Sequence, residues 1–172
     1  MFGRIRQRLR DVGTIRALCL GAEKHALKSQ HLAPGAEHFL LAALELPDGS
    51  ARRVFQRVQA DPFELPLAVT RQYDDALRYV GIDPDHITSI NGASPPLAKP
   101  GGLYRAAASG QAVMQNLSAL RKKDKDIPLL GAHVVAAIAE QKQGVAARSL
   151  RAMGIDLDAL QAAANEEIRT AS

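Results

Sequence analysis

Residues 36–65 read AEHFLLAALELPDGSARRVFQRVQADPFEL, and residues 131–160 read GAHVVAAIAEQKQGVAARSLRAMGIDLDAL. An offset of 95 residues aligns the two stretches without a gap, and most paired positions hold residues of the same class. Eight of the thirty positions are identical: His38/His133, Ala42/Ala137, Glu45/Glu140, Gly49/Gly144, Ala51/Ala146, Arg53/Arg148, Asp61/Asp156 and Leu65/Leu160. A match of this length indicates an internal repeat.

Each copy predicts a run of short helices. Residues 38–46 are apolar almost all round, which is typical of a buried helix. Gly49 and Gly144 follow this segment in the two copies, and glycine tolerates the left-handed turn that ends many helices. Asp61 and Asp156 are placed to cap the N-terminus of a later helix. The sequence therefore predicts two similar helical units.

The repeated motif resembles a known family, the amino-terminal domain of Clp ATPase unfoldases. The opening Met1–Arg4 (MFGR) and the segment Gly144–Arg148 (GVAAR) are similar to its ClpC branch. The resemblance implies an all-α fold of two tandem pseudo-symmetric four-helix repeats. On this interpretation residues 1–80 form the first repeat, residues 81–102 a Pro/Gly-rich linker and residues 103–172 the second repeat, together in one compact domain.

Composition agrees with an all-α chain. The 172 residues are 47% hydrophobic but only 4% aromatic, and no segment alternates polar and apolar residues long enough to predict a strand. The single Cys19 excludes an internal disulfide framework. No apolar run is long enough for a transmembrane helix, so we expect a cytoplasmic protein without a membrane partner. The net charge is +4, and residues 1–30 alone carry +5.

The flanking segments give further expectations. Residues 5–30 predict a long first helix that is weakened at Gly13, where a break is an option. A helix is also expected from Asp61 onward, through Val80. The tail Glu166–Ser172 is expected to fray.

The chain lacks the motifs of the enzyme classes that we considered. It has no G-x-x-x-x-G-K-[ST] phosphate loop, no arrangement of a cysteine with histidine and asparagine, and no histidine spacing typical of a metal site. We therefore expect no catalytic residues, no metal and no cofactor.

The resemblance implies a non-enzymatic recognition module in protein quality control, which binds peptide segments of substrates or adaptors in an apolar groove between the repeats. One alternative is a stand-alone accessory protein that docks on a Clp protease complex and regulates it. Another, of a different class, is a basic helical nucleic-acid binder, although Arg4, Arg6, Arg8 and Arg10 spread over both sides of a helix instead of forming one stripe.

Two positions at the start of each buried helix are candidate site residues. The recurring His38 and His133 either bond to a neighbouring loop or contact a ligand. Glu37 matches an acidic residue that, in the ClpC branch, lies at a surface site resembling a phosphoarginine pocket; the alternative is an exposed glutamate favoured by the helix dipole.

Ala36, Phe2 and Arg4 complete the candidate ligand site implied by the resemblance. In the second repeat Ala132 offers no carboxylate, so a guanidinium ligand, if one binds, is expected in the first repeat; the alternative is that no such ligand binds and the groove is the only site. Open helix N–H groups at Gly35 and Ala36 would hold its phosphate.

Overall fold

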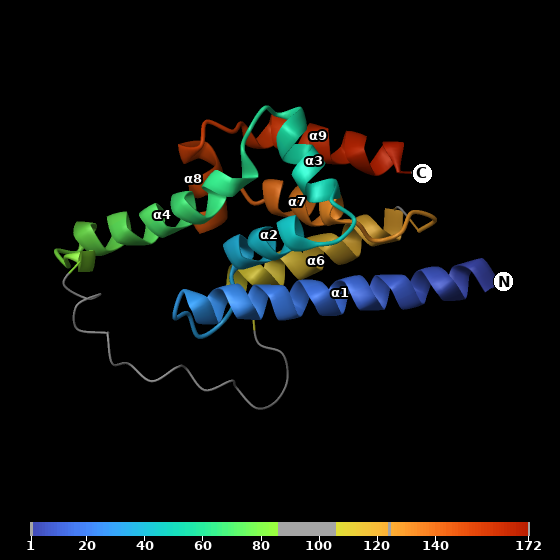
Figure 1. The fold of residues 1–172 in the computed structure, drawn as a ribbon, viewed down its shortest axis with the longest axis horizontal. Helices are drawn as coiled ribbons and strands as arrows, with labels where there is room; N and C mark the ends of the chain where they lie inside the picture. Colours follow the sequence, from blue (N-terminus) through green and yellow to red (C-terminus); the bar gives the residue numbers. More distant parts are fainter. Residues whose placement is uncertain (1, 86–105, 124, 172) are drawn as a thin grey trace.

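The computed structural model describes residues 2–85, 106–123 and 125–171, with side chains from residue 6 onward. All regular elements in these ranges are helical, as the composition predicts. In chain order they are α1 (Phe2–Lys28), α2 (Ala36–Glu45), α3 (Ser50–Arg57), the 3-10 turn η1 (Pro62–Glu64), α4 (Leu65–Tyr79), α6 (Ala108–Lys123), α7 (Gly131–Ala139), α8 (Val145–Ala152) and α9 (Leu157–Thr170) (Figure 1). No helix in the described part of the chain is long and apolar enough to cross a membrane.

Helices α2 and α7 form the centre of the molecule. Every residue of α2 from Ala36 to Leu44 is buried, and so is every residue of α7. The two helices contact each other, α1 packs on α2, and α6 packs on α7. The prediction of a buried helix in each copy is confirmed, because neither helix has a polar face to turn toward water.

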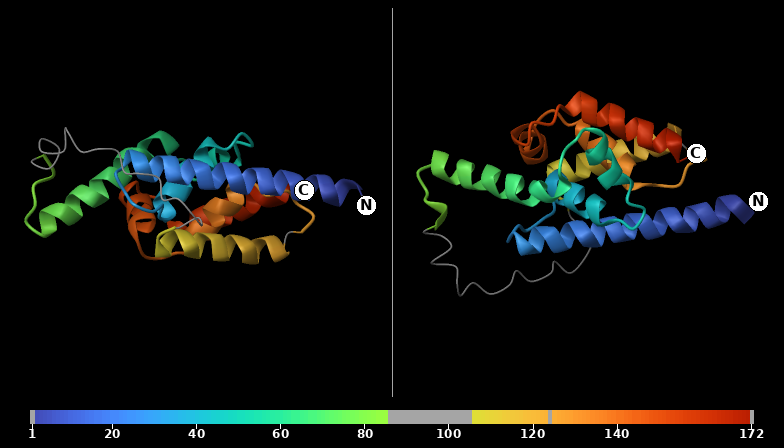
Figure 2. Two further views of the ribbon diagram at one scale, coloured as in Figure 1. Left: turned by 90° about the horizontal axis from the view of Figure 1, so that it is seen from below. Right: turned by 45° about the horizontal axis from the view of Figure 1, so that its top comes forward.

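The remaining helices pack between the two halves of the chain. Helix α3 lies against α9, and α4 lies against α8, so each short helix covers a helix that is distant in sequence (Figures 1 and 2). Asp61 and Asp156 cap η1 and α9 as predicted, by accepting hydrogen bonds from the N–H groups of Phe63 and Ala159 at 2.9 and 2.8 Å. Gly49 and Gly144 have positive φ angles of 67° and 97°, as expected for the turns before α3 and α8.

The offset of 95 residues recurs in the helix limits. Helix α3 spans residues 50–57 and α8 spans 145–152, while α1 ends at Lys28 and α6 at Lys123. Helix α6 begins at Ala108, which pairs with Gly13 under this offset. Helix α6 therefore corresponds to residues 13–28 of α1, and residues 2–12 of α1 precede this shared part.

One difference between the halves shapes the surface. Helix α9 packs extensively along α7, whereas α4 makes only sparse contact with α2. Helix α4 projects from the body at the end of the molecule opposite to the two termini (Figures 1 and 2). The first half is therefore more open than the second.

The predicted long first helix is confirmed, and α1 continues through Gly13 without a break, because its buried residues Leu18, Ala22 and Ala26 hold one face on the core. The expectation about the tail is wrong. Helix α9 extends to Thr170 instead of fraying, since Glu167 and the neighbouring Ile168 are buried. Most of the expected linker, residues 81–102, and the expected start of the second repeat at Leu103 lie outside the described residues.

Candidate functional site

The two recurring histidines close the N-termini of the central helices. The N–H group of Gly35 donates to His38 Nδ1 at 2.9 Å, and that of Leu130 donates to His133 Nδ1 at 3.1 Å. Both rings are almost fully buried. Each ring therefore satisfies a backbone donor that the helix itself leaves without a partner. The interpretation that these histidines bond to a neighbouring loop is confirmed.

The hydrogen bond from Gly35 fixes the tautomer of His38. Because Nδ1 accepts, the neutral ring carries its hydrogen on Nε2, which then donates to His31 Nδ1 at 3.0 Å. Burial lowers the pKa of His38 to about 4; the charge of Glu37 opposes this decrease, and His31 adds to it. The ring is therefore uncharged at neutral pH.

Glu37 is buried, with 4% of its surface exposed, so the interpretation as an exposed glutamate is wrong. Its Oε1 accepts a hydrogen bond from the hydroxyl of Tyr73 in α4, at 2.5 Å. Burial, together with this bond to Glu37, raises the pKa of Tyr73 above its usual range. The ring of His31 packs on Tyr73, with 4.3 Å between their centroids. Glu37 therefore joins α2 to α4 instead of facing solvent.

His31, Glu37 and His38 bring possible metal-ligand atoms within 4.8 Å of one another. Their hydrogen bonds assign them a different role. His38 Nδ1 accepts from Gly35, and Nε2 is needed as a donor to His31, so the neutral ring has no lone pair left for a metal. We therefore describe these side chains, with Tyr73, as the Glu37 network: Glu37, His38, His31 and Tyr73.

The sequence analysis missed the contributions of His31 and Tyr73 to this network. A signal was present in the repeat offset. Glu37 pairs with Ala132, and Tyr73 pairs with Ile168, so a hydrogen-bonded pair in the first half is replaced by two apolar residues in the second. Both positions change together, which is consistent with contact in space.

The helix N-termini are closed, contrary to the expectation of open N–H groups. The N–H group of Ala36 donates to Ser109 Oγ of α6 at 3.1 Å. At α7, the N–H group of Ala132 donates to Ser50 Oγ at 2.8 Å, and that of Gly131 to Asp48 Oδ2 at 3.1 Å. Both ends thus have internal partners, including the end of α2 at which a phosphate was predicted.

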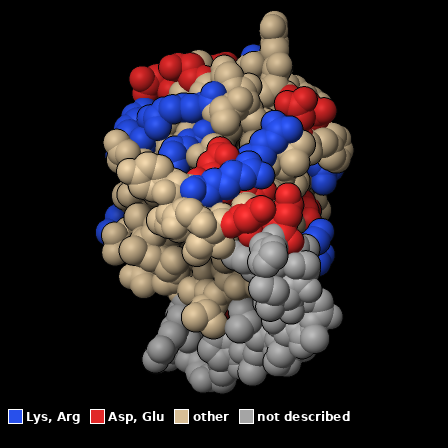
Figure 3. All heavy atoms as spheres, turned by 90° about the vertical axis from the view of Figure 1, so that its left-hand side faces the viewer, with Lys and Arg blue, Asp and Glu red and all other residues tan. Residues whose placement is uncertain are grey.

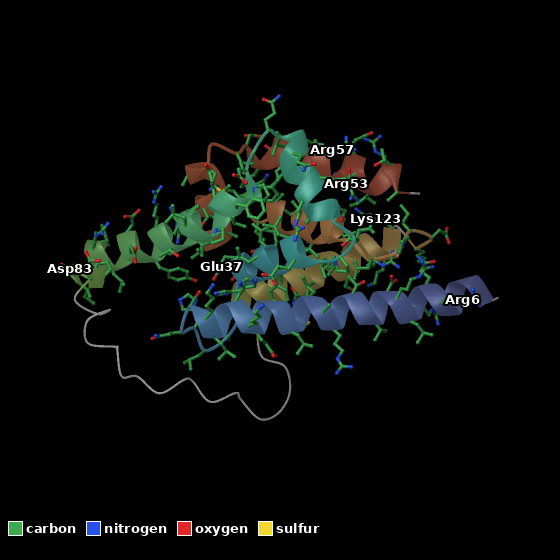
Figure 4. All side chains as sticks on the ribbon, viewed as in Figure 1. Arg6, Glu37, Arg53, Arg57, Asp83 and Lys123 are labelled. Carbon is green, nitrogen blue, oxygen red and sulfur yellow. The ribbon has the colours of Figure 1, made fainter. Side chains whose placement is uncertain are left out.

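The remaining predicted residues are not brought together with Glu37. The side chains of Phe2 and Arg4 lie outside the described residues, and their backbone lies in the first turn of α1. Arg6, close by in the same helix, is far from Glu37 along the molecule (Figure 4). The phosphoarginine site expected from Ala36, Glu37, Phe2 and Arg4 is therefore not assembled by these contacts.

A groove of about 840 Å³ lies instead between the C-terminal part of α1, helix α2 and helix α4. Its apolar lining includes Leu41, Val69 and Leu77. On its rim, His25 Nε2 lies 3.1 Å from Glu45 Oε1. We call this space the α1–α4 groove.

The α1–α4 groove is not in the expected place between the two halves. There α2 and α7 contact each other directly, and the core side chains fill the space. The groove exists because α4 lies away from α2, with His31 and Tyr73 of the Glu37 network at its wall. In the second half the smaller Ala132 and apolar Ile168 occupy the matching positions, and α9 lies close to α7.

No known family model matches the chain, and no curated protein matches it significantly.

Proposed function

We propose that this chain is a non-enzymatic recognition module of the Clp amino-terminal type, in which two tandem four-helix repeats are interlocked. Reciprocal contacts support the repeat. Arg53 in α3 pairs with Glu167 in α9, and Arg148 in α8 donates to Gln72 in α4 at 3.2 Å. Arg148 lies 95 residues after Arg53, and Gln72 lies 95 residues before Glu167. Equivalent positions of the two halves therefore contact each other in both directions, as a pseudo-two-fold arrangement requires.

The α1–α4 groove is the observation that carries the proposed function. Its volume of about 840 Å³ falls in the range of ligand sites, which combine apolar walls with a few polar groups. Leu41, Val69 and Leu77 offer contact to apolar side chains, while Lys28 and Asp74 offer polar contacts. A short apolar segment of an unfolded protein or of an adaptor fits this chemistry. The module would then present clients in quality control and proteolysis.

Binding of a permanently unfolded protein tests this function. We would titrate fluorescein-labelled, reduced and carboxymethylated lactalbumin with the full chain and follow the fluorescence anisotropy. Thr70→Arg places a long charged side chain in the α1–α4 groove from an exposed position of α4. Gln56→Arg adds the same side chain at an exposed position of α3, away from the groove, as the matched control.

We expect Thr70→Arg to weaken binding at least tenfold and Gln56→Arg to leave it unchanged. Equal binding by both variants would contradict the assignment of the groove. ATP hydrolysis that remains with the protein after further purification would contradict its non-enzymatic character.

A further inference from the structure

The net charge of the chain is concentrated at one end of the molecule. Segments 1–12 and 121–126 together carry +5, and the rest of the chain carries −1. The structure joins these segments, because Gln7 Nε2 donates to Lys125 O at 3.0 Å and Asp11 forms an ion pair with Arg121. Arg6 and Lys123 lie toward the same end (Figure 4). On the face shown in Figure 3, by contrast, basic and acidic side chains intermix.

Six exposed cations gather here, and no carboxylate among the described residues pairs with any of them. They are Arg6, Arg8 and Arg10 of α1, Lys122 and Lys123 at the end of α6, and Lys125, which follows α6 in the chain. A hollow of about 610 Å³ between α1 and α6 is lined by four cations, two carboxylates and two uncharged polar residues: Arg8, Arg121, Lys122, Lys125, Asp11, Asp126, Gln7 and Ser118. This end therefore offers both a cationic surface and a polar recess.

The outward face of α1 is also apolar. Leu9, Val12 and Leu20 are 68%, 63% and 56% exposed, and helical spacing places Leu9 and Leu20 on the side of the helix opposite to the buried Leu18. Their spacing, with Arg16 between them, follows one stripe along the helix. Arg6, Arg10 and Lys24 fall on its flank by the same helical spacing. Helix α1 runs along one side of the molecule (Figure 1).

Under the 95-residue offset α6 begins opposite Gly13, so Leu9 and Val12 precede the part of α1 that corresponds to α6. This part of α1 combines the exposed Leu9 and Val12 with Arg6, Arg8 and Arg10, which form an ion pair with no carboxylate that the structure describes. A surface of this composition indicates a partner that is both anionic and apolar.

We propose that this face of α1, with the basic end of α6, binds reversibly to the surface of an anionic phospholipid membrane. An interfacial helix places leucines among the acyl chains and basic residues among the headgroups. A nucleic-acid backbone would use the six cations but leave Leu9, Val12 and Leu20 in water.

This function goes beyond peptide recognition in the α1–α4 groove. It also revises the expectation of no membrane partner, which rested on the missing spanning segment. A helix that lies on the bilayer needs no such segment.

Cosedimentation of the full chain with vesicles tests the proposal. One set of vesicles contains phosphatidylcholine mixed with phosphatidylserine, and the other contains phosphatidylcholine alone. We expect binding only to the first set, and weakening as salt is raised. The double variant Arg6→Gln/Arg10→Gln should lower the partition coefficient by about 25-fold, since each basic residue near such a surface contributes about fivefold. The control Arg71→Gln/Arg78→Gln removes the same charge from exposed positions of α4 and should have little effect.

The apolar contribution separates a membrane from other polyanions. Leu9→Ser should reduce vesicle binding by about tenfold, whereas Leu67→Ser, at a similarly exposed position of α4, should not. No binding to phosphatidylserine vesicles would overturn the proposal. So would binding of duplex DNA that is as tight as vesicle binding and indifferent to Leu9→Ser, because that result would assign the surface to nucleic acid.

Discussion

Acidification should destabilise the fold through His38, and the effect can be worked out from its surroundings. The ring is buried, its Nδ1 accepts from Gly35, and its pKa is lowered to about 4 from an ordinary value of 6.5. The unfolded chain therefore binds a proton near pH 6.5, while the folded chain does so only near pH 4. Because the unfolded state holds more protons between these values, the free energy of unfolding must fall as the pH falls through this window.

The size of the effect follows from the two pKa values. Between pH 7 and pH 5, the difference in proton binding removes about 2 kcal/mol of stability through His38 alone. His31 also has a pKa lowered by burial, so it acts in the same direction. A loss of this size is a substantial fraction of the stability of a small domain.

Urea unfolding followed by circular dichroism, at several pH values from 7 to 5, measures the effect. The variant His38→Gln keeps an acceptor for the Gly35 N–H group, as glutamine does in a capping box, but it does not titrate in this range. We expect the pH dependence of the variant to be shallower than that of the natural chain by about 2 kcal/mol over this interval. Parallel curves for the two proteins would refute the reasoning.

Three further predictions concern packing, charge and ligand binding. Gly13→Ala should stabilise the chain by about 0.5–1 kcal/mol, because a Cβ there meets no atom within 4 Å in an unbroken helix; Gly110→Ala should destabilise it by about 1–3 kcal/mol, because its Cβ would collide with the backbone and with an aromatic ring. Thermal unfolding compares the two, and a loss for Gly13→Ala would contradict the first. Glu167→Gln should cost about 1–3 kcal/mol in urea unfolding, since it removes a buried charge held by two arginines of α3. Burial raises the pKa of Glu167, but the two arginines lower it by more, so the net pKa is below its ordinary value. The stability that the ionised Glu167 contributes is therefore present at neutral pH and is lost as the pH falls through its pKa. A variant as stable as the natural chain at pH 7 would be evidence against the buried pair. Phosphoarginine should leave the NMR signals around Glu37 unchanged, because Tyr73 already occupies the carboxylate; shifts confined to that segment would show that the site opens.

The local features of this fold could be predicted from the sequence. Residues 38–46 have no polar face, so their burial follows from composition. The capping roles of Asp61 and Asp156 depend on residues that are two and three positions away. Interactions over such short distances along the chain leave a direct pattern in the sequence.

The candidate site depends on contacts between distant residues, and these were not predicted. Glu37 is buried because Tyr73, from a helix 36 residues later, covers and bonds its carboxylate. The N–H group of Ala36 is closed by Ser109, which belongs to the other half of the chain. The position of α4 decides where the groove lies, and a single sequence contains no direct measure of that position.

Chemical-shift mapping of the bound peptide tests the central claim most directly. Isotope-labelled protein would be titrated with an unlabelled apolar peptide taken from the unfolded lactalbumin, and the amide signals followed by NMR. The account predicts shifts clustered at residues that line the α1–α4 groove, including Leu41, Val69, Thr70 and Leu77, and their loss in Thr70→Arg. Shifts clustered on α7 and α8, with the groove signals unchanged, would contradict it.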